Sequence, residues 1–191
     1  MLLLVGLGNP GPKDINNRHN IGFKIIDAVN SHFKLSKQKP KFKGLLTTGM
    51  IGENKVYALK PLTFMNNSGT AIKELIDYFK IDAKDVIVFH DDLDIDFGKI
   101  KAKFAGSSAG HHGIDSVDKF IGKDYSRVRI GIGHPKNKIK VNNHVLEDFK
   151  EDEEDQIKEI AENIVKLLPT LLEKKIDLFS SKVNSSLLAL I

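Results

Sequence analysis

The stretch VGLGNPGPKDINNRHN, residues 5–20, decides how this chain can fold. The apolar run of residues 2–5 stops abruptly at glycines and prolines, which is typical of a buried strand that enters a loop at its carboxyl end. The loop then places Asn9 and His19 ahead of an amphipathic helix pattern that begins near Ile21. Because the reactive side chains of open α/β sheets gather at this edge, we expect a functional site here.

The glycines of residues 6–11 match the GxGxxG dinucleotide fingerprint literally. That fingerprint requires its last glycine to lie in a helix whose amino end faces a pyrophosphate. Here Pro10 and Pro12 flank Gly11, and no helical pattern starts for several more residues. The pattern therefore favours a tight turn that brings the backbone and Asn9 close to a substrate.

The length of 191 residues suits one large domain, residues 1–191, which buries roughly 70% of the surface of its unfolded chain. The absence of cysteine excludes disulfides and thiolate catalysis. No apolar run is long enough to span a bilayer, and residues 1–4 lack the basic flank of a signal peptide, so we expect a cytoplasmic protein with no membrane partner. We also expect a monomer. The net charge of +4 permits a polyanionic partner without requiring one.

Strand and helix patterns alternate along the chain. Strands are predicted at residues 2–5, 45–50, 55–59, 86–89, 100–104 and 128–132, and helices at residues 21–33, 68–79, 111–120 and 151–172. The basic and polar segment 34–43, which contains Pro40, is expected to be a loop. This alternation predicts an α/β fold: a single domain with a mixed, twisted β-sheet and helices on both faces.

Four groups of chemically capable side chains stand at predicted strand ends or in the loops that follow them: Asn9 with His19, Met65–Asn66, His90–Asp92 and Gly110–Gly113. The carboxyl ends of parallel strands meet at one edge of a sheet, so we expect these groups to converge.

His19 is the best candidate for a general base, because an ordinary imidazole, with a pKa near 6.5, is largely neutral at cytosolic pH and can take a proton from water. A loop histidine that bonds the backbone or contacts phosphate is the alternative. Asp91 follows a buried strand, where a carboxylate can hold the histidine tautomer and stabilise the imidazolium. Its alternative is an Asx turn or a helix cap.

Asn9 and Asn66 offer amide donors and acceptors that do not titrate, which suits them to position a carbonyl or a peptide backbone. For Asn66 a plain turn is the competing explanation. Met65 is expected to form an apolar wall beside the site, with core packing as the alternative. Phe64 is expected to lie in the core.

Two basic pairs follow the two-residue period of a strand: Lys101 with Lys103, and Arg127 with Arg129. Such pairs can grip phosphates, arginine by bidentate hydrogen bonds, although a solvated face explains the same alternation. A further basic stretch at residues 136–140 is either a substrate-side loop or an ordinary exposed one.

A metal centre is not indicated. Candidate ligands are present at His90–Asp92 and at His111 and His112, but no HExxH or similar spacing occurs, and neighbouring residues on a helix point in different directions. We therefore expect no metal and no cofactor, with a nucleotide- or metal-dependent enzyme as a remaining alternative.

Six ordered motifs resemble those of bacterial-type peptidyl-tRNA hydrolase: Gly6–Gly11, Arg18–Asn20, Thr63–Gly69, His90–Asp94, Gly106–Gly113 and Arg127–Gly133. The resemblance covers most of residues 1–150, and beyond them only a similar helical ending. It implies an esterase that releases peptides from the 3′ end of tRNA, with peptidyl-tRNA as its partner. It also implies that recycling of stalled peptidyl-tRNA is the biological role.

The resemblance also implies roles for individual residues. His19 activates water with Asp91 as its orienting partner, while Asn9 and Asn66 hold the substrate, and we count Met65 and His112 among the substrate-binding residues as well. By the same resemblance, Lys103 and Arg129 clamp the 5′ phosphate of the tRNA.

Two residues depart from the family pattern. Asp14 stands where tyrosine is usual, and His112 stands where asparagine is usual, at a position that helps to place the water or the tRNA end. Histidine can replace asparagine there only while it is neutral. If His112 lies near His19, the two rings titrate as a coupled pair and the acid limb of activity becomes steeper than one proton. His112 also leaves open an alternative function, an RNA-binding relative that does not cleave its ligand.

Overall fold

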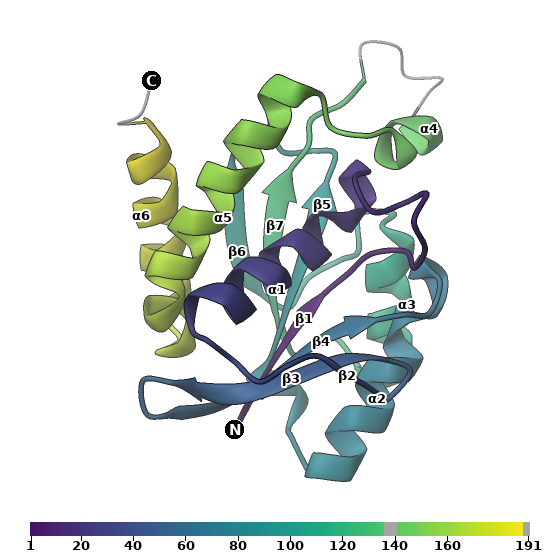
Figure 1. Ribbon diagram of the computed structural model, residues 1–191, viewed down its shortest axis with the longest axis vertical. Coiled ribbons are helices and arrows are strands. Elements are labelled where there is room, and N and C mark those ends of the chain that lie inside the picture. The colour runs from purple at the N-terminus through teal and green to yellow at the C-terminus, as the bar shows by residue number, and fades with distance from the viewer. Residues whose placement is uncertain (136–140, 189–191) are drawn as a thin grey trace.

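The computed structural model describes residues 1–135 and 141–188. Seven strands form one sheet in the order β2-β3-β4-β1-β5-β7-β6 (Figure 1). Their bounds are β1 Leu2–Gly6, β2 Lys39–Lys41, β3 Gly44–Ile51, β4 Asn54–Pro61, β5 Val86–Asp92, β6 Ile100–Phe104 and β7 Ser126–Gly131. The helices are α1 Ile21–His32, α2 Ser68–Phe79, α3 His112–Ile121, α4 Val141–Leu146, α5 Glu151–Leu172 and α6 Ile176–Leu188, with 3₁₀ turns η1 Arg18–Asn20, η2 Met65–Asn67 and η3 Ala83–Asp85.

The centre of the sheet is parallel and its margins are antiparallel. β1 pairs in parallel with both β4 and β5, and β5 pairs in parallel with β7. The hairpin β3–β4 and the pair β6–β7 are antiparallel. The chain therefore leaves β1 with a parallel neighbour on each side, which is the arrangement that opens a crevice at the carboxyl ends of the strands.

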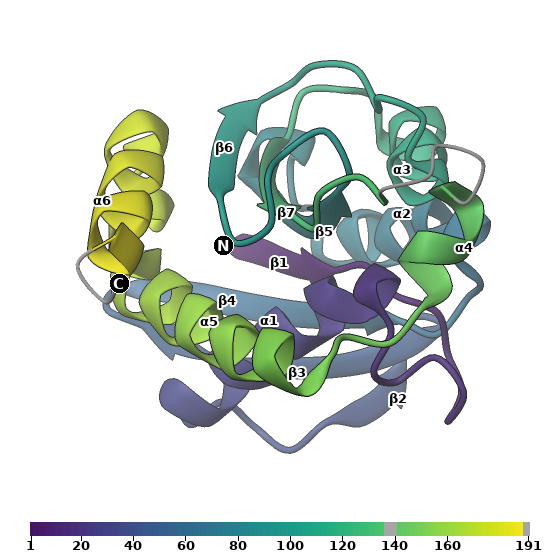
Figure 2. The same cartoon turned by 90° about the horizontal axis from the view of Figure 1, so that it is seen from above.

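Helices cover both faces of the sheet, as Figure 2 shows. One apolar cluster joins α1, α5 and α6 to the sheet and includes Leu4, Phe89 and Ile164. The other cluster joins α2 and α3 to the opposite face and includes Leu3 and Val88. Each fully buried aliphatic side chain of this kind contributes roughly 1.5–3 kcal/mol. The α/β fold with a mixed sheet and helices on both faces is thus confirmed.

Two glycines let α1 pack directly on the strands. A Cβ on Gly22 would lie 2.4 Å from the backbone nitrogen of Leu7 and 2.5 Å from the carbonyl oxygen of Phe89. A Cβ on Gly6 would lie 2.1 Å from the carbonyl oxygen of Gly22. Any larger side chain at either position would push α1, and the turn η1 ahead of it, away from the sheet.

Three elements differ from the sequence prediction. The segment expected to be a loop, residues 34–43, contains the short edge strand β2, which pairs with β3 across three residues. Pro40 is tolerated there because an edge strand leaves one side of its backbone unpaired. The helices α4 and α6 were not predicted from periodicity, because α4 is only six residues long and the apolar pattern of α6 is weak. The basic stretch 136–140 lies outside the described residues.

Within the described part of the chain, no helix combines the length and apolar character needed to cross a membrane.

Candidate active site

The loop after β1 and the end of β5 build the site between them. The loop stays against β5 because the Leu7 amide donates to the Phe89 carbonyl at 3.0 Å. η1 follows this loop and carries His19, while Asp91 lies near the carboxyl end of β5. Both residues are buried, with 8% of His19 and 2% of Asp91 exposed.

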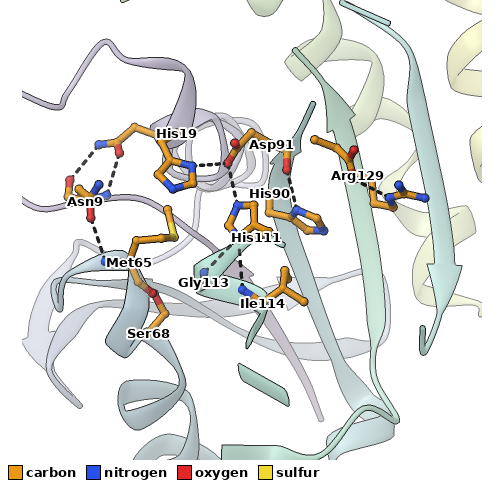
Figure 3. A network of polar contacts seen from close by, with 12 residues as sticks. Asn9, His19, Met65, Ser68, His90, Asp91, His111, Gly113, Ile114 and Arg129 are labelled. Atoms are coloured by element: carbon orange, nitrogen blue, oxygen red, sulfur yellow. Dashed lines mark hydrogen bonds and ion pairs between the residues drawn. The ribbon is translucent and has the colours of Figure 1, made fainter. Parts of the chain in front are cut away.

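Asp91 accepts hydrogen bonds from two histidines through a single oxygen (Figure 3). Its Oδ1 lies 2.8 Å from His19 Nδ1 and 2.9 Å from His111 Nε2. The two imidazole rings are 4.9 Å apart between centroids. Asp91 therefore orients both rings at once.

The neighbouring backbone fixes the tautomer of His111. Its Nδ1 accepts from the amides of Gly113 and Ile114 at 3.1 and 3.2 Å, so that His111 caps the amino end of α3. An accepting Nδ1 carries no proton, so Nε2 carries it and donates to Asp91. His111 thus acts as a donor to Asp91 through Nε2.

His19 has the opposite arrangement. An ionised Asp91 only accepts, so Nδ1 of His19 must be protonated, and Nε2 of the neutral ring is then free to take a proton. This is the orientation in which a histidine acts as a general base towards water.

The carboxylate also sets the basicity of His19. Burial of the ring favours its neutral form, but the charge and hydrogen bond of Asp91 outweigh this, and Asp14 adds to them, so the pKa of His19 is raised above 6.5. Burial alone would raise the pKa of Asp91, whereas His19 and His111 hold it well below its usual range. Asp91 therefore stays ionised, and His19 becomes a stronger base.

His90 lies behind this group and remains neutral. Its Nδ1 donates to the Asp91 carbonyl at 2.7 Å, and its ring meets the His111 ring edge-on at 4.9 Å. Burial, followed by the neighbouring His111, lowers the pKa of His90 to about 3. Its Nε2 is buried without a hydrogen-bond partner among the described residues.

Asn9 joins the loop after β1 to η2. Its Oδ1 accepts from the Met65 amide at 2.8 Å (Figure 3). Its backbone is held by Asn20, whose Oδ1 accepts from the Asn9 amide at 2.7 Å and whose Nδ2 donates to the Asn9 carbonyl at 2.9 Å. These bonds fix the orientation of the Asn9 side chain, whose Nδ2 is its hydrogen-bond donor.

Two adjoining cavities open onto His19. One, of about 300 Å³, is lined by His19, Asp91, His111, His112 and Val145, among others. The second, of about 490 Å³, is lined by Asn9, His19, Phe64, Met65, Asn66, His112, Val145 and Leu146. The proposed base therefore lines two cavities whose walls contain both polar and apolar side chains.

Comparison with known proteins shows which family the chain belongs to. A family model described as Peptidyl-tRNA hydrolase matches residues 3–189. The chain belongs to the peptidyl-tRNA hydrolase family. A peptidyl-tRNA hydrolase of Pelagibacter ubique is 71% identical over 97% of this chain and 100% of its own length. One of Gluconobacter oxydans is 43% identical over 96% of this chain and 97% of its own. The crystal structure of the Acinetobacter baumannii peptidyl-tRNA hydrolase is 31% identical and superposes with a TM-score of 0.89 over 96% of this chain and 94% of that one.

The residues expected to bind substrate differ in exposure. Met65 is buried, 5% exposed, and forms part of the wall of the second cavity, whereas Asn66 is exposed at its rim. The prediction that Phe64 lies in the core is wrong, since 70% of it is exposed. Phe64 precedes η2, a turn whose single buried residue is Met65, so only one of the two apolar side chains turns inward.

Lys103 and Arg129 lie on adjacent strands, β6 and β7, beside the site. Nε of Arg129 donates to Asp92 Oδ2 at 2.7 Å, a contact that uses neither of its terminal nitrogens. Partial burial lowers the pKa of Lys103, and the neighbouring Arg129 and Arg127 add to the effect. Arg127 is no surface cation: it is 1% exposed and bonds Asp118 Oδ1 at 2.7 Å. The solvated-face explanation is therefore wrong for Arg127.

His112 occupies the first position of α3, at the rim of both cavities. Its side chain is 77% exposed, and its nearest acidic partner is Asp115 at 4.0 Å. The charges that act on His19 come from Asp91 and Asp14. Water screens an exposed charge strongly, so the structure offers little support for the expected coupling of His112 with His19.

The group of His19, Asp91 and His111 contains three atoms of the kind that bind metal ions, all within 4.8 Å of one another. Its 2.8 and 2.9 Å contacts are hydrogen-bond lengths, and each depends on a proton that a cation would have to displace. The arrangement is therefore ready for proton transfer, whereas it could bind a metal ion only after the two hydrogen-bond protons had been removed.

Sequence reasoning missed two members of the site, His111 as a partner of Asp91 and Asn20 as the support of Asn9. From the sequence we expected the Gly110–Gly113 group near the site but gave His111 no role beyond that of a possible metal ligand, and its spacing of 20 residues from Asp91 gives no local signal of their contact. Asn20 lies next to His19 within the motif Arg18–Asn20, and its place in that motif was the signal that could have pointed to a role in the site.

Proposed function

We propose that this chain hydrolyses the ester bond between a peptide and the 3′ end of tRNA, and so releases free tRNA for reuse. The observation that carries the proposal is the His19–Asp91 pair, whose proton arrangement leaves Nε2 unprotonated in a ring that lines both cavities. Membership of the peptidyl-tRNA hydrolase family supports the choice of substrate.

The reaction needs one water and one proton carrier. Nε2 of His19 removes a proton from water as the oxygen attacks the ester carbonyl carbon. Asp91 stabilises the imidazolium that results. When the tetrahedral intermediate collapses, the bond to the ribose oxygen breaks, and His19 returns its proton to that oxygen. The products are a peptide carboxylic acid and a tRNA with a free 3′ hydroxyl, so the atoms and protons balance.

The remaining site residues hold the substrate in this proposal. Nδ2 of Asn9 and the amide of Asn66 donate to the ester or peptide carbonyl, and Met65 packs against the acyl group. His112, at the rim of both cavities, contacts the tRNA end.

Lys103 and Arg129 bind the 5′ phosphate of the tRNA in this proposal. Their charges lie on two adjacent strands beside the base, and Asp92 keeps the guanidinium of Arg129 in place. Arginine and lysine together provide both bidentate and point-charge contacts to phosphate oxygens.

We further propose that the protein acts in the cytoplasm, as a monomer in a single domain and without a cofactor. Size-exclusion chromatography with light scattering tests the oligomeric state. Activity that survives chelator treatment would support the cofactor-free mechanism, and loss restored by a divalent ion would overturn it.

Hydrolysis of N-acetyl-aminoacyl-tRNA beside unblocked aminoacyl-tRNA tests the activity itself. We expect the blocked substrate to be cleaved much faster, because only it mimics a peptide linkage next to the ester. Binding of both tRNAs without turnover would instead support an RNA-binding relative, an alternative for which the intact His19–Asp91 pair gives no reason.

A further inference from the structure

Arg18 directly precedes His19 in the turn η1 and is almost completely buried, with 4% exposed. Burial of a guanidinium is unfavourable unless its donors are paired. Among the described residues, Nη1 and Nη2 find their partners in residues 147–153, between the end of α4 and the first turn of α5, whereas the buried Nε has no partner there. Arg18 therefore joins the turn that carries the base to a segment far away in the sequence.

The side chain makes four contacts with that segment. Nη1 donates to the carbonyls of Glu147 and Asp148 at 3.2 and 2.6 Å, and Nη2 donates to Glu153 Oε2 at 2.6 Å. The guanidinium also lies over the ring of Phe149, 5.3 Å from its centroid. A planar fork is needed to reach these partners together, which arginine has and lysine lacks.

The backbone makes the same connection. The Arg18 amide donates to the Glu147 carbonyl at 3.1 Å, and the Phe149 amide donates to the Asn16 carbonyl at 3.2 Å. Asn17 and Asp148 form an antiparallel bridge between them. Residues 16–18 and 147–149 thus form a short two-stranded pairing that the Arg18 side chain closes.

The segment gripped by Arg18 follows directly after α4, which carries part of the wall of the site. Val145 lines both cavities beside His19, and Leu146 lines the second. Figure 2 shows α4 between the purple turn ahead of α1 and the helix α3. α4 also has a longer contact with the residue that follows β7, from His144 Nε2 to the Ile132 carbonyl at 3.4 Å.

We propose that Arg18 is a positioning residue that sets the distance between the apolar wall of α4 and the base His19. An acyl-adenosine end held against Val145 and Leu146 then presents its ester carbonyl to Nε2 of His19. This inference rests on the proposed function. It assigns Arg18 no contact with substrate, and its charge is not among those that act on His19.

A double-mutant cycle between Arg18→Lys and Leu146→Ala tests the inference. Arg18→Lys keeps the charge but loses the fork, and we expect kcat/KM for N-acetyl-aminoacyl-tRNA to fall by up to roughly 10²-fold, the scale of a misplacement near 1 Å. If Arg18 acts through the α4 wall, the loss caused by Arg18→Lys should shrink at least about threefold once Leu146 is alanine. Losses that simply multiply would overturn the proposal.

The pH profile supplies a second readout. Asp91, not Arg18, sets the protonation of His19, so the acid limb of kcat/KM should stay in place in Arg18→Lys. A shifted limb would mean that Arg18 acts on the base itself, which contradicts a role through α4.

Lys24→Gln is the matched control. Lys24 Nζ bonds Glu154 at 3.0 and 3.2 Å, so it ties α1 to the same first turn of α5 without touching residues 147–149. We expect near-normal kinetics, and an equal loss would show that any weakening of α5 is enough. All variants are assayed well below their melting temperatures.

If Arg18→Lys does not fold, Glu153→Gln carries the same cycle, because it weakens one partner and leaves both carbonyls of the segment. We expect Glu153→Gln to lower kcat/KM less than Arg18→Lys does, and we expect this loss also to shrink once Leu146 is alanine. Losses of kcat/KM that simply multiply in this cycle would equally overturn the inference. No turnover by the wild-type protein would overturn the proposed function instead, and this inference with it.

Discussion

Replacing His90 by asparagine should remove an acid-induced loss of stability that the wild-type protein shows. His90 is 3% exposed, and burial lowers its pKa to about 3. In the unfolded chain its pKa returns to about 6.5. Between these values the unfolded state binds a proton at residue 90 and the folded state does not, so stability falls as the pH falls.

The magnitude follows from the size of the shift. Each pKa unit corresponds to about 1.4 kcal/mol, so the free energy of unfolding should fall by that amount per pH unit below about 6.5. Over the whole interval down to about 3 the loss is on the order of 5 kcal/mol. This is comparable with the total stability of many domains.

Urea unfolding of both proteins between about pH 6.5 and 4.5 measures the effect. Asparagine keeps a donor near the position of Nδ1, which bonds the Asp91 carbonyl, but does not titrate. Its smaller volume costs a constant amount at every pH. As the pH falls across this interval, the free energy of unfolding of the wild-type protein should therefore fall by roughly 3 kcal/mol relative to that of the variant. Parallel curves would refute the reasoning, since His90 would then titrate alike in both states.

Four further predictions follow, three on activity and one on tRNA binding. His19→Ala should lower turnover by roughly 10²–10⁴-fold with the fold retained, and near-normal turnover would place the base elsewhere. Asp14→Asn should move the acid limb of kcat/KM to lower pH, because the Asp14 charge raises the pKa of His19 and only neutral His19 is active; an unmoved limb would argue against that charge effect. Lys103→Gln and Arg129→Gln should each flatten the salt dependence of tRNA binding by about 0.7–0.9 in log–log slope, with exposed Lys158→Gln as control, and unchanged slopes would exclude phosphate contacts. The wild-type and His112→Asn proteins should both show a single-proton acid limb of kcat/KM, since 77% of the His112 side chain is exposed; a steeper limb in the wild-type protein alone would show that His112 and His19 titrate as a coupled pair.

The sequence was sufficient for the elements that bury wide apolar faces. β6 and α5 begin and end where periodicity predicted them, because alternation and the helical stripe reflect burial directly. β2 and α4 were not predicted, because three or six residues are too few to show a period.

The site was predictable to the extent that it lies at strand ends. His19 and Asp91 were singled out from their positions after β1 and β5, and their 2.8 Å contact is compatible with the roles suggested. The link from Asp91 to His111 depends on how α3 packs beside β5, and the link from Arg18 to Glu153 spans 135 residues. Contacts of this kind arise from tertiary packing and leave no local pattern in a single sequence.

The close packing of α1 on β1 at Gly6 and Gly22 determines which parts of the protein can unfold locally. Because these glycines seat α1 directly on β1 and β5, the turn with His19 belongs to the same packed unit as the central strands. Amide hydrogens in such units exchange only through large-scale unfolding, whereas peripheral short elements open at far lower free energy. The amides of residues 22–26 should therefore exchange slowly and those of α4 quickly, so that the turn with His19 keeps its place on the central strands even when α4 opens locally.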